Sequence, residues 1–341
     1  MQELSQSEDL LVRELFERSR KECDEEFGPI KKVEKLSGDA SSRKYYRIFS
    51  KASSYVISID SPENLTKADF NFITTQKIFS ENNVRVPKIF HVITNRGYTL
   101  QEDLGDQTLL LENVSLTGSD EEYKLYERVC DQLLKINLIP PSKYESESLV
   151  RNRFDFEKLM WEVRFTNKYF IEQHLERAIP ETVERHFQDI VNKITEEEYC
   201  VVHRDFHSRN VMMVDGEVVI IDFQDARLGP PQYDLCSLLE DAYYKISKAA
   251  KEKLIKSYYE KLVSNGLYSK SEKEFKSFYN LVSIQRTYKA MGTFCYIFHE
   301  RGDARYLKYI HSCFENLKRK LWELEEYNEL RQTLSKFYYA S

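Results

Sequence analysis

The strongest constraint on the fold comes from residues 199–234, where polar side chains interrupt several short apolar segments. Residues 199–202 are apolar and predict a short buried strand. Residues 211–214 and 218–221 are rich in Val and Ile, and only residues 215–217 separate them. Because this three-residue connection contains a glycine, the two segments predict a β-hairpin.

The hairpin makes a prediction about neighbouring polar side chains. If Val214 pairs with Val218, Asn210 lies opposite Asp222 at the open end of the ribbon, on the same face. Amide and carboxylate oxygens are ligands that suit Mg²⁺. Asp205 precedes Asn210 in the same loop. One aspartate can therefore face a hydroxyl group while the other two residues hold a metal on a nucleotide, as in phosphoryl transfer.

A hairpin with polar ends can also be purely structural. That alternative does not explain why Asp205, Asn210 and Asp222 all lie at the ends of apolar strands. Carboxylates in such places are costly unless they are compensated. The pattern therefore favours a functional site.

The same stretch resembles a known family. His203-Arg204-Asp205 followed by Asn210 matches the H-R-D-x-x-x-x-N catalytic loop of protein-kinase-like folds. Asp222 stands where the metal-binding aspartate of D-F-G would stand. The segments HRDFHSRN and IDFQDARLGPPQYDL resemble the aminoglycoside/choline phosphotransferase superfamily, and within it the bacterial anomeric kinases of N-acetylmuramate and N-acetylglucosamine.

This resemblance implies an α+β fold with two lobes. Residues 1–102 would form a nucleotide-binding lobe, with a helix at 7–27 and an antiparallel five-stranded sheet. Residues 103–106 would be the hinge, and residues 107–341 a larger, mostly helical lobe with the catalytic loop and the acceptor site. The implied cofactors are ATP and Mg²⁺, and Asp205 would be the catalytic residue.

Composition excludes several other classes. A chain of 341 residues is long enough for two lobes, each with its own core. The net charge of −6 argues against a general nucleic-acid binder, and no apolar run approaches the roughly 20 residues of a membrane span. The six cysteines have no metal-binding spacing, which indicates reduced thiols and a cytoplasmic protein.

The predicted phosphate-binding loop is residues 37–43, between strands at 31–36 and 44–49. Its small side chains would let backbone N–H groups approach phosphate oxygens, although a plain hairpin turn is the alternative. The loop sequence GDASSRKYYR also resembles the corresponding loop of the anomeric kinases. The nucleotide-binding candidates here are Gly38, Ser41, Ser42 and Arg43.

The third predicted strand, 55–60, departs from the kinase pattern. The lysine that contacts the α- and β-phosphates in that pattern is missing, and the helix at 66–82 has no glutamate at its middle to pair with it. Either another cation replaces the lysine or catalysis is impaired, and we favour replacement. The candidate cations are Arg43, Lys44 and Arg47.

Strands at 86–93 and 97–102 lead to the hinge, where Glu102 and Leu104 are the candidates for contact with the nucleotide base. The resemblance implies that backbone groups read the adenine there. Beyond the hinge, helices are predicted at 119–138, 154–175, 180–197, 249–265 and 271–300.

The acceptor site is expected in this helical lobe. The substrate-binding candidates are His207, Arg209, Gln224, Asp225 and Arg286, and weaker candidates are Trp161, Glu162 and Arg164. Asp234 reads as the N-cap of a helix, and the resemblance implies that it braces the catalytic loop.

The expected activity is an ATP- and Mg²⁺-dependent small-molecule kinase acting on a sugar hydroxyl, with the anomeric hydroxyl of N-acetylmuramate or N-acetylglucosamine preferred by resemblance. Choline, ethanolamine, homoserine and aminoglycoside acceptors stay open, and the abundant aromatic residues keep choline among them. From another class, a nucleotide-binding pseudokinase scaffold stays open because of the missing lysine.

Overall fold

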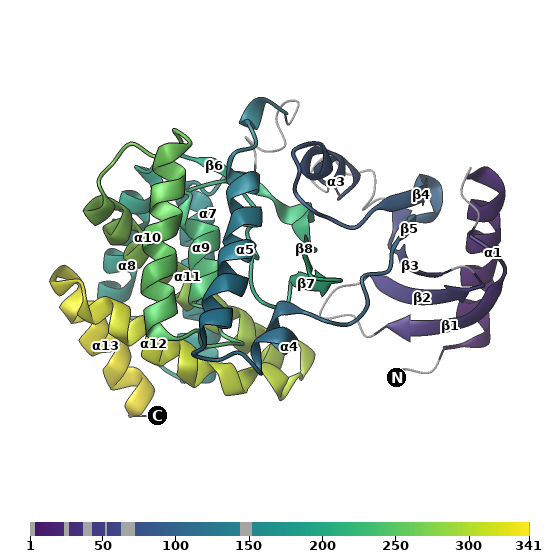
Figure 1. The fold of residues 1–341 in the computed structure, drawn as a ribbon. Helices are drawn as coiled ribbons and strands as arrows, with labels where there is room; N and C mark the ends of the chain where they lie inside the picture. The colour runs from purple at the N-terminus through teal and green to yellow at the C-terminus, as the bar shows by residue number, and fades with distance from the viewer. Residues whose placement is uncertain are drawn as a thin grey trace. The chain divides into compact units, whose positions relative to one another are not determined.

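A computed structural model describes residues 4–23, 27–36, 43–51, 53–62, 72–143 and 152–340. The chain divides into two compact units (Figure 1). Unit 1 comprises Met1–Gln107 and Met212–Asp225, and unit 2 comprises Thr108–Val211 and Ala226–Ser341. The sequence-based division placed residues 212–225 with the C-terminal lobe, whereas the structure joins them to unit 1.

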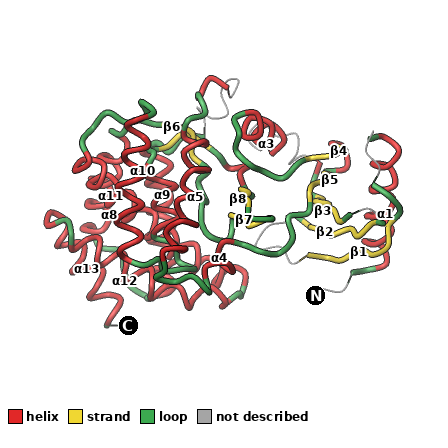
Figure 2. The backbone as a smooth tube through the Cα atoms, viewed as in Figure 1, coloured by secondary structure: helices red, strands yellow, loops and turns green. Residues whose placement is uncertain are grey.

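Unit 1 contains the predicted five-stranded antiparallel sheet, with the strand order β1-β2-β3-β5-β4. Figure 2 shows these strands in yellow. β4 begins later than predicted, because Pro87 has no N–H group to donate to a neighbouring strand. The strands are β1 Ile30–Leu36, β2 Lys44–Ser50, β3 Ser54–Ile59, β4 Ile89–Ile93 and β5 Tyr98–Glu102.

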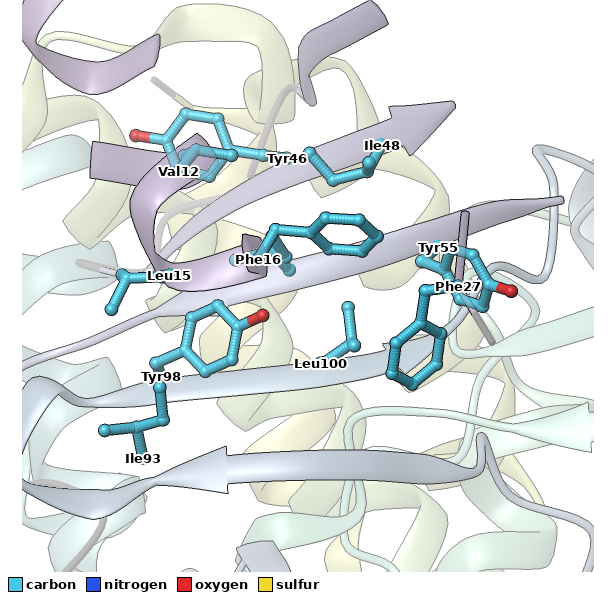
Figure 3. Close-up of a cluster of buried hydrophobic side chains, with 11 residues drawn as sticks. Val12, Leu15, Phe16, Phe27, Tyr46, Ile48, Tyr55, Ile93, Tyr98 and Leu100 are labelled. Carbon is cyan, nitrogen blue, oxygen red and sulfur yellow. The ribbon is translucent and has the colours of Figure 1, made fainter. Parts of the chain in front are cut away.

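Helix α1, Gln6–Glu22, packs its apolar stripe on this sheet (Figure 3). A capping box starts the helix, since Ser5 accepts from the backbone of Glu8 and Glu8 accepts from the backbone of Ser5. The helix ends before the predicted residue 27, and residues 24–26 lie outside the described part of the chain. The shared core includes Val12, Leu15, Phe16, Tyr46, Ile48, Tyr98 and Leu100.

Residues 212–225 are held in unit 1 by hydrogen bonds and ring stacking. Met213 donates its N–H to the carbonyl of Gln107 at 2.8 Å, and Ile220 donates to the carbonyl of Arg85 at 2.8 Å. Phe223 stacks on Phe72 of helix α3 (Phe72–Glu81) with ring centroids 5.1 Å apart. These contacts explain why residues 212–225 belong to unit 1, although the catalytic loop that precedes them in the chain belongs to unit 2.

The hairpin is present, but its turn is shorter than predicted. β7 (Val211–Val214) and β8 (Glu217–Ile220) leave only Asp215 and Gly216 between them. Both residues have positive φ, 47° and 81°, which fits the tight I′ turn of a two-residue hairpin. The predicted three-residue turn is therefore wrong, and the register that placed Asn210 directly opposite Asp222 does not follow from it.

Unit 2 is mostly helical, as predicted (Figure 1). Its helices are α4 Leu109–Asn113, α5 Asp120–Asn137, α7 Phe156–Thr166, α8 Glu181–Thr195, α9 Gln232–Leu239, α10 Lys248–Ser264, α11 Glu272–Arg301, α12 Ile310–Trp322 and α13 Asn328–Tyr339. The predicted helix at 154–175 continues from α7 into the π-helical segment Asn167–His174. In the part of the chain that the structure describes, no helix is both long and apolar enough to span a membrane.

The long helix α11 packs closely against α7 at Gly292. A Cβ atom added to this glycine would lie 2.3 Å from Oγ1 of Thr166, so no larger residue fits without a shift. Nearby, Nε2 of Gln285 donates to Oε2 of the buried Glu162 at 3.1 Å. This close approach fixes the two helices that flank the catalytic loop of unit 2.

Candidate active site

The catalytic loop follows β6 (Cys200–Val202), which pairs with the unpredicted strand β9 (Arg227–Gly229). Arg204 has a φ of 85°, so the chain turns sharply there. The carboxylate of Asp234 accepts from the backbone N–H of His203 at 2.5 Å and of Arg204 at 2.9 Å. Asp234 thus braces the loop, as the family resemblance implied.

The predicted N-cap role of Asp234 is wrong. Helix α9 begins at Gln232, so Asp234 lies in its first turn, and its carboxylate serves the catalytic loop instead of the helix end. Burial raises the pKa of Asp234 to about 6, although the two backbone donors favour the ionised form.

A second brace was not predicted from the sequence. Asp241 accepts from both the backbone N–H of Ser208, at 3.0 Å, and its hydroxyl, at 2.5 Å. The carbonyl of Ser208 in turn accepts from the N–H of Leu110 at 3.0 Å. The loop that carries Asp205 is therefore fixed at both of its ends.

Two cations face the carboxylate of Asp205. Nζ of Lys289 lies 3.2 Å from Oδ1, and Nε of Arg204 lies 3.7 Å from Oδ2. Burial disfavours the ionised carboxylate, but the charges of Lys289, Arg204, His207 and Arg286 hold the pKa of Asp205 well below its usual range. Asp205 is therefore an ionised hydrogen-bond acceptor, and its side chain is still 27% exposed.

The two predicted metal ligands present hard oxygens, each in its own unit. Nδ2 of Asn210 donates to the carbonyl of Asp205 at 2.9 Å, which leaves Oδ1 as the amide atom suited to a cation. Asp222 follows β8 with a φ of 62°, and its Oδ1 accepts from Nε2 of Gln224 at 2.6 Å. An amide oxygen and a carboxylate oxygen are each of a type that suits Mg²⁺, which commonly takes only one or two protein oxygens alongside phosphates and water.

No cluster of three or more His, Cys, Asp or Glu side chains suited to a metal occurs among the residues with described positions. A protein-only metal cage is therefore not formed there.

Among the three candidate cations, Arg43 has the surroundings that best suit the role of the missing lysine. Its Nε lies 3.3 Å from Oδ2 of Asp60, and its Nη1 donates to the hydroxyl of Tyr45 at 3.1 Å. Burial raises the pKa of Tyr45. The positive charge of Arg43 lowers this pKa, and the negative charges of Asp222 and Asp60 raise it further. Arg43, Asp60 and Asp222 thus belong to one polar cluster of unit 1.

The other two candidate cations have structural partners. Nζ of Lys44 pairs with Glu8 of α1 at 3.0 Å. Arg47 pairs with Asp103 at 2.9 Å and with Asp106 at 2.9 Å, so it fixes the predicted hinge segment. Of the three, Arg43 is therefore the one near the predicted metal ligand of this unit.

The remaining nucleotide candidates divide into two groups. Gly38, Ser41 and Ser42 lie outside the described residues. The carboxylate of Glu102 is engaged by Arg85 and by the N–H of Lys88 at 3.0 Å, and its backbone N–H donates to the carbonyl of Lys88 at 2.9 Å. Leu104 is half-buried.

The acceptor candidates of unit 2 lie around the catalytic loop. Arg286 is buried, its Nη2 donates to the hydroxyl of Ser237, and its charge reaches Asp205. The rings of His207 and Tyr243 meet edge to face, and the guanidinium of Arg209 lies 4.9 Å from the centre of the Tyr243 ring. In unit 1, Gln224 contacts Asp222, and Asp225 ends the short 3₁₀ helix Phe223–Asp225.

Lys289 is the main residue of this site that sequence reasoning missed. It lies on α11 one turn after Arg286, so the two side chains share a helix face. That spacing was the available signal. The motif around Asp205 contains no hint of a partner 84 residues away.

The fold and the loop define a phosphotransferase of the protein-kinase-like class that transfers to a hydroxyl acceptor. Residues 32–262 match the model of the phosphotransferase enzyme family, and the chain belongs to this family.

The chain is similar to curated proteins named N-acetylmuramate/N-acetylglucosamine kinase. One, from Neisseria meningitidis serogroup B, is 28% identical over 276 residues and covers 79% of this chain and 80% of its own. Another, from Pseudomonas putida, is 27% identical over 320 residues and covers 90% and 88%.

Solved structures confirm the fold. A choline kinase from Cryptosporidium parvum Iowa II superposes with a TM-score of 0.64 at 12% identity, covering 97% of this chain and 99% of its own. The streptomycin-ATP-APH(2")-IIa ternary complex gives a TM-score of 0.58 at 14% identity, covering 92% and 97%. At these identities the likeness concerns the fold alone.

Proposed function

We propose that this protein is an ATP- and Mg²⁺-dependent sugar kinase that phosphorylates the anomeric hydroxyl of N-acetylmuramate or N-acetylglucosamine, acting in the cytoplasm. The observation that carries the proposal is the carboxylate of Asp205, held ionised beside Lys289 in a loop that Asp234 and Asp241 fix. The sugar is supported by the names of the curated relatives.

Asp205 accepts the hydrogen bond of the attacking hydroxyl and orients its oxygen toward the γ-phosphate. Its low pKa makes it a weak base, which suits a loose transition state in which the acceptor proton leaves late. Lys289 lies within reach of the same carboxylate and adds positive charge where the phosphoryl group passes.

Asn210 and Asp222 would hold Mg²⁺, which neutralises charge on the β- and γ-phosphates when it is bound. The hydrogen bond from Nδ2 of Asn210 to Asp205 orients the amide so that its oxygen is the ligand. The contact with Gln224 restricts the carboxylate of Asp222 in the same way.

Arg43 takes the place of the missing lysine as the phosphate-facing cation of unit 1. Its pKa is raised even though burial opposes its charge, because Tyr45 and Asp60 stabilise the guanidinium. It also lies over the ring of Phe72, 5.5 Å from the ring centre, which keeps the side chain in place.

Choline, ethanolamine and aminoglycoside acceptors fit this site less well. All three are cations, and the carboxylate of Asp205 already pairs with two cations, Lys289 and Arg204. A positively charged acceptor would be repelled where a neutral or anionic sugar is not.

The test is an ADP-release assay with Mg²⁺-ATP and a panel of N-acetylmuramate, N-acetylglucosamine, choline, ethanolamine and an aminoglycoside. We expect turnover with at least one amino sugar and none with the cationic acceptors. Turnover confined to a cationic acceptor contradicts the sugar assignment, and ATP binding without turnover on any acceptor supports the scaffold alternative.

A further inference from the structure

The segment between α9 and α10, residues 240–247, contacts the second half of the catalytic loop through one aspartate and one tyrosine. Oδ2 of Asp241 accepts from the backbone N–H and the hydroxyl of Ser208, and Oδ1 accepts from the backbone N–H of Tyr243 at 2.9 Å. A single carboxylate therefore joins Ser208 of the loop to the backbone of Tyr243. This link holds the tyrosine beside the loop.

The ring of Tyr243 lies against the two residues that flank Ser208. Its centre is 5.3 Å from that of the His207 ring, with the two planes at 72°, and 4.9 Å from the guanidinium carbon of Arg209. An edge-to-face pair of rings and a cation over a ring face are both attractive, and each prefers a particular orientation. Because one side chain makes both contacts, Tyr243 constrains His207 and Arg209 together.

Other aromatic rings of unit 2 pack around Tyr243. Tyr309 meets it edge to face, with ring centres 4.9 Å apart and planes at 88°, and the ring of Phe294 on α11 lies 6.2 Å away. Phe294 is buried and stacks on the buried Tyr306, whose ring centre lies 5.9 Å from the guanidinium carbon of Arg209. Closely packed rings have few alternative rotamers, so Tyr243 is a rigid support for the loop.

His207 connects this support to Asp205 and Asn210. Its backbone N–H donates to the carbonyl of Asp205 at 3.1 Å, and its carbonyl accepts from the N–H of Asn210 at 2.9 Å. Nδ2 of Asn210 donates to the same carbonyl of Asp205 at 2.9 Å. The turn from Asp205 to Asn210 is therefore built around His207, and a shift of His207 would move both ends of this turn.

We propose that Tyr243 is a positioning residue whose ring orients His207 and Arg209. Through His207 it fixes the turn that carries Asp205. The effect on catalysis rests on the proposed function, in which Asp205 orients the acceptor hydroxyl. A displacement of about 1 Å at such a group can lower the rate by about a hundredfold, so the support of the turn contributes directly to kcat.

The experiment measures kcat and KM for Tyr243→Leu and Tyr243→Phe with Mg²⁺-ATP and the amino sugar, N-acetylmuramate or N-acetylglucosamine, that the wild type phosphorylates faster. Leucine removes the ring, so kcat should fall by about ten- to a hundredfold. The KM for ATP should stay within about twofold, because the nucleotide candidates belong to unit 1.

Tyr243→Phe tests whether the ring is the part that matters. It keeps both ring contacts and loses only the hydroxyl, which also interacts with Arg209. Its kcat should therefore fall by about threefold at most. All rates are measured well below the melting temperature of each variant, so that loss of folding does not enter kcat.

Tyr244→Leu is the matched control. Tyr244 is the next residue of the same segment, but its ring stacks on Tyr126 of α5 with ring centres 6.2 Å apart. Its hydroxyl donates to Glu122 at 2.6 Å. This variant removes a ring of the same size and should lower the melting temperature, while its kcat should stay close to that of the wild type.

A double-mutant cycle tests whether Tyr243 acts through His207. Once His207→Ala has removed the imidazole, the tyrosine ring has lost one of its two partners in the loop. The double variant should therefore lose much less activity than the product of the two single losses. If Tyr243→Leu does not fold, Tyr309→Leu takes its place, since it removes a ring that supports Tyr243, and its kcat should fall in the same direction by less.

The outcomes separate this role from the proposed function. Phosphorylation of neither amino sugar by the wild type overturns the proposed function, and the positioning role with it. Turnover by the wild type together with an unchanged kcat of Tyr243→Leu, or of Tyr309→Leu in its place, overturns only the positioning role. The same holds if Tyr244→Leu lowers kcat as much as Tyr243→Leu, or if the two losses in the double-mutant cycle multiply.

Discussion

Each unit holds a carboxylate next to a cation, but the two pairs differ in burial. In unit 1, Arg43 and Asp60 form a pair in which both side chains are 6% exposed. In unit 2, Lys289 and Asp205 are 17% and 27% exposed. Breaking a buried ion pair leaves a buried charge without a partner, so such a pair stays in place. A more exposed pair can exchange partners at a smaller cost in free energy.

This difference matches the two tasks of a phosphotransferase. In the proposed mechanism the phosphate-binding side must present a cation in one position, and the pair of Arg43 with Asp60 would do so. In the same mechanism the acceptor side must release its cation partly when a hydroxyl arrives at Asp205, and the pair with Lys289 would permit that. The following variants test this contrast, from the largest expected effect to the smallest.

Replacing Asp205 with Asn should have the largest effect. The neutral amide is a weaker hydrogen-bond acceptor and no longer holds Lys289, so kcat should fall by about a thousandfold. Steady-state kinetics should show little change in the KM for ATP. Asp215→Asn in the hairpin turn is the control, since asparagine suits the positive φ there, and it should retain wild-type activity. Activity of Asp205→Asn near the wild-type level would remove Asp205 from the mechanism.

Replacing Arg43 tests the fixed pair of unit 1. Arg43→Lys keeps the charge but loses the forked contacts with Asp60 and Tyr45, so we expect the KM for ATP to rise about tenfold. The KM for the sugar should stay within about twofold. Arg47→Lys is the control, because Arg47 contacts Asp103 and Asp106 instead. An equal effect of the two variants on ATP would mean that Arg43 has no special role at the phosphates.

Asp234→Asn tests how far the brace fixes the catalytic loop. The amide has one acceptor oxygen in place of two, so one of the two backbone N–H groups is left unpaired. The free energy of unfolding should fall by about 1–3 kcal/mol, measured by urea denaturation. Asp131→Asn, which removes one partner of an exposed ion pair, should lower the free energy of unfolding much less. If the two variants cost the same, Asp234 is not a brace.

Glu8→Gln should have the smallest effect, because Glu8 pairs with Lys35 and Lys44 and has no role in the proposed mechanism. Its contacts lower the pKa of Glu8 to about 2, with the hydrogen bond to Lys44 as the largest cause. Stability from this group is therefore present above its ordinary pKa of 4.5 and lost as the pH falls through about 2.

At pH 7 the free energy of unfolding of the wild type, measured by urea denaturation, should exceed that of Glu8→Gln by less than about 1 kcal/mol, since surface pairs are screened. The gap should close as the pH falls from 5 toward 2. A gap that widens on acidification would contradict the assignment.

Residue patterns predicted the individual strands and helices and the loop with Asp205, because periodicity and motif spacing are local, and the family resemblance implied their assembly into a five-stranded sheet and a helical second region. It missed the contacts of Lys289 and Asp241 with the loop, since these join residues far apart in sequence. It also misread Asp234 as an N-cap, because an aspartate before an apolar helix suits both roles and only tertiary contacts decide between them. The predicted hairpin turn was one residue too long, because Glu217 belongs to strand β8 and not to the turn.

The central claim is that Asp205 directs phosphoryl transfer to the anomeric hydroxyl of an amino sugar. It is tested most directly by comparing free N-acetylglucosamine and N-acetylmuramate with their methyl glycosides, in which the anomeric oxygen is blocked, using phosphorus NMR to locate the phosphate. We predict a phosphate coupled to the C1 proton for at least one free sugar, and no product from the methyl glycosides or from Asp205→Asn. Equal phosphorylation of a free sugar and its methyl glycoside would place the reaction at another hydroxyl and contradict the claim.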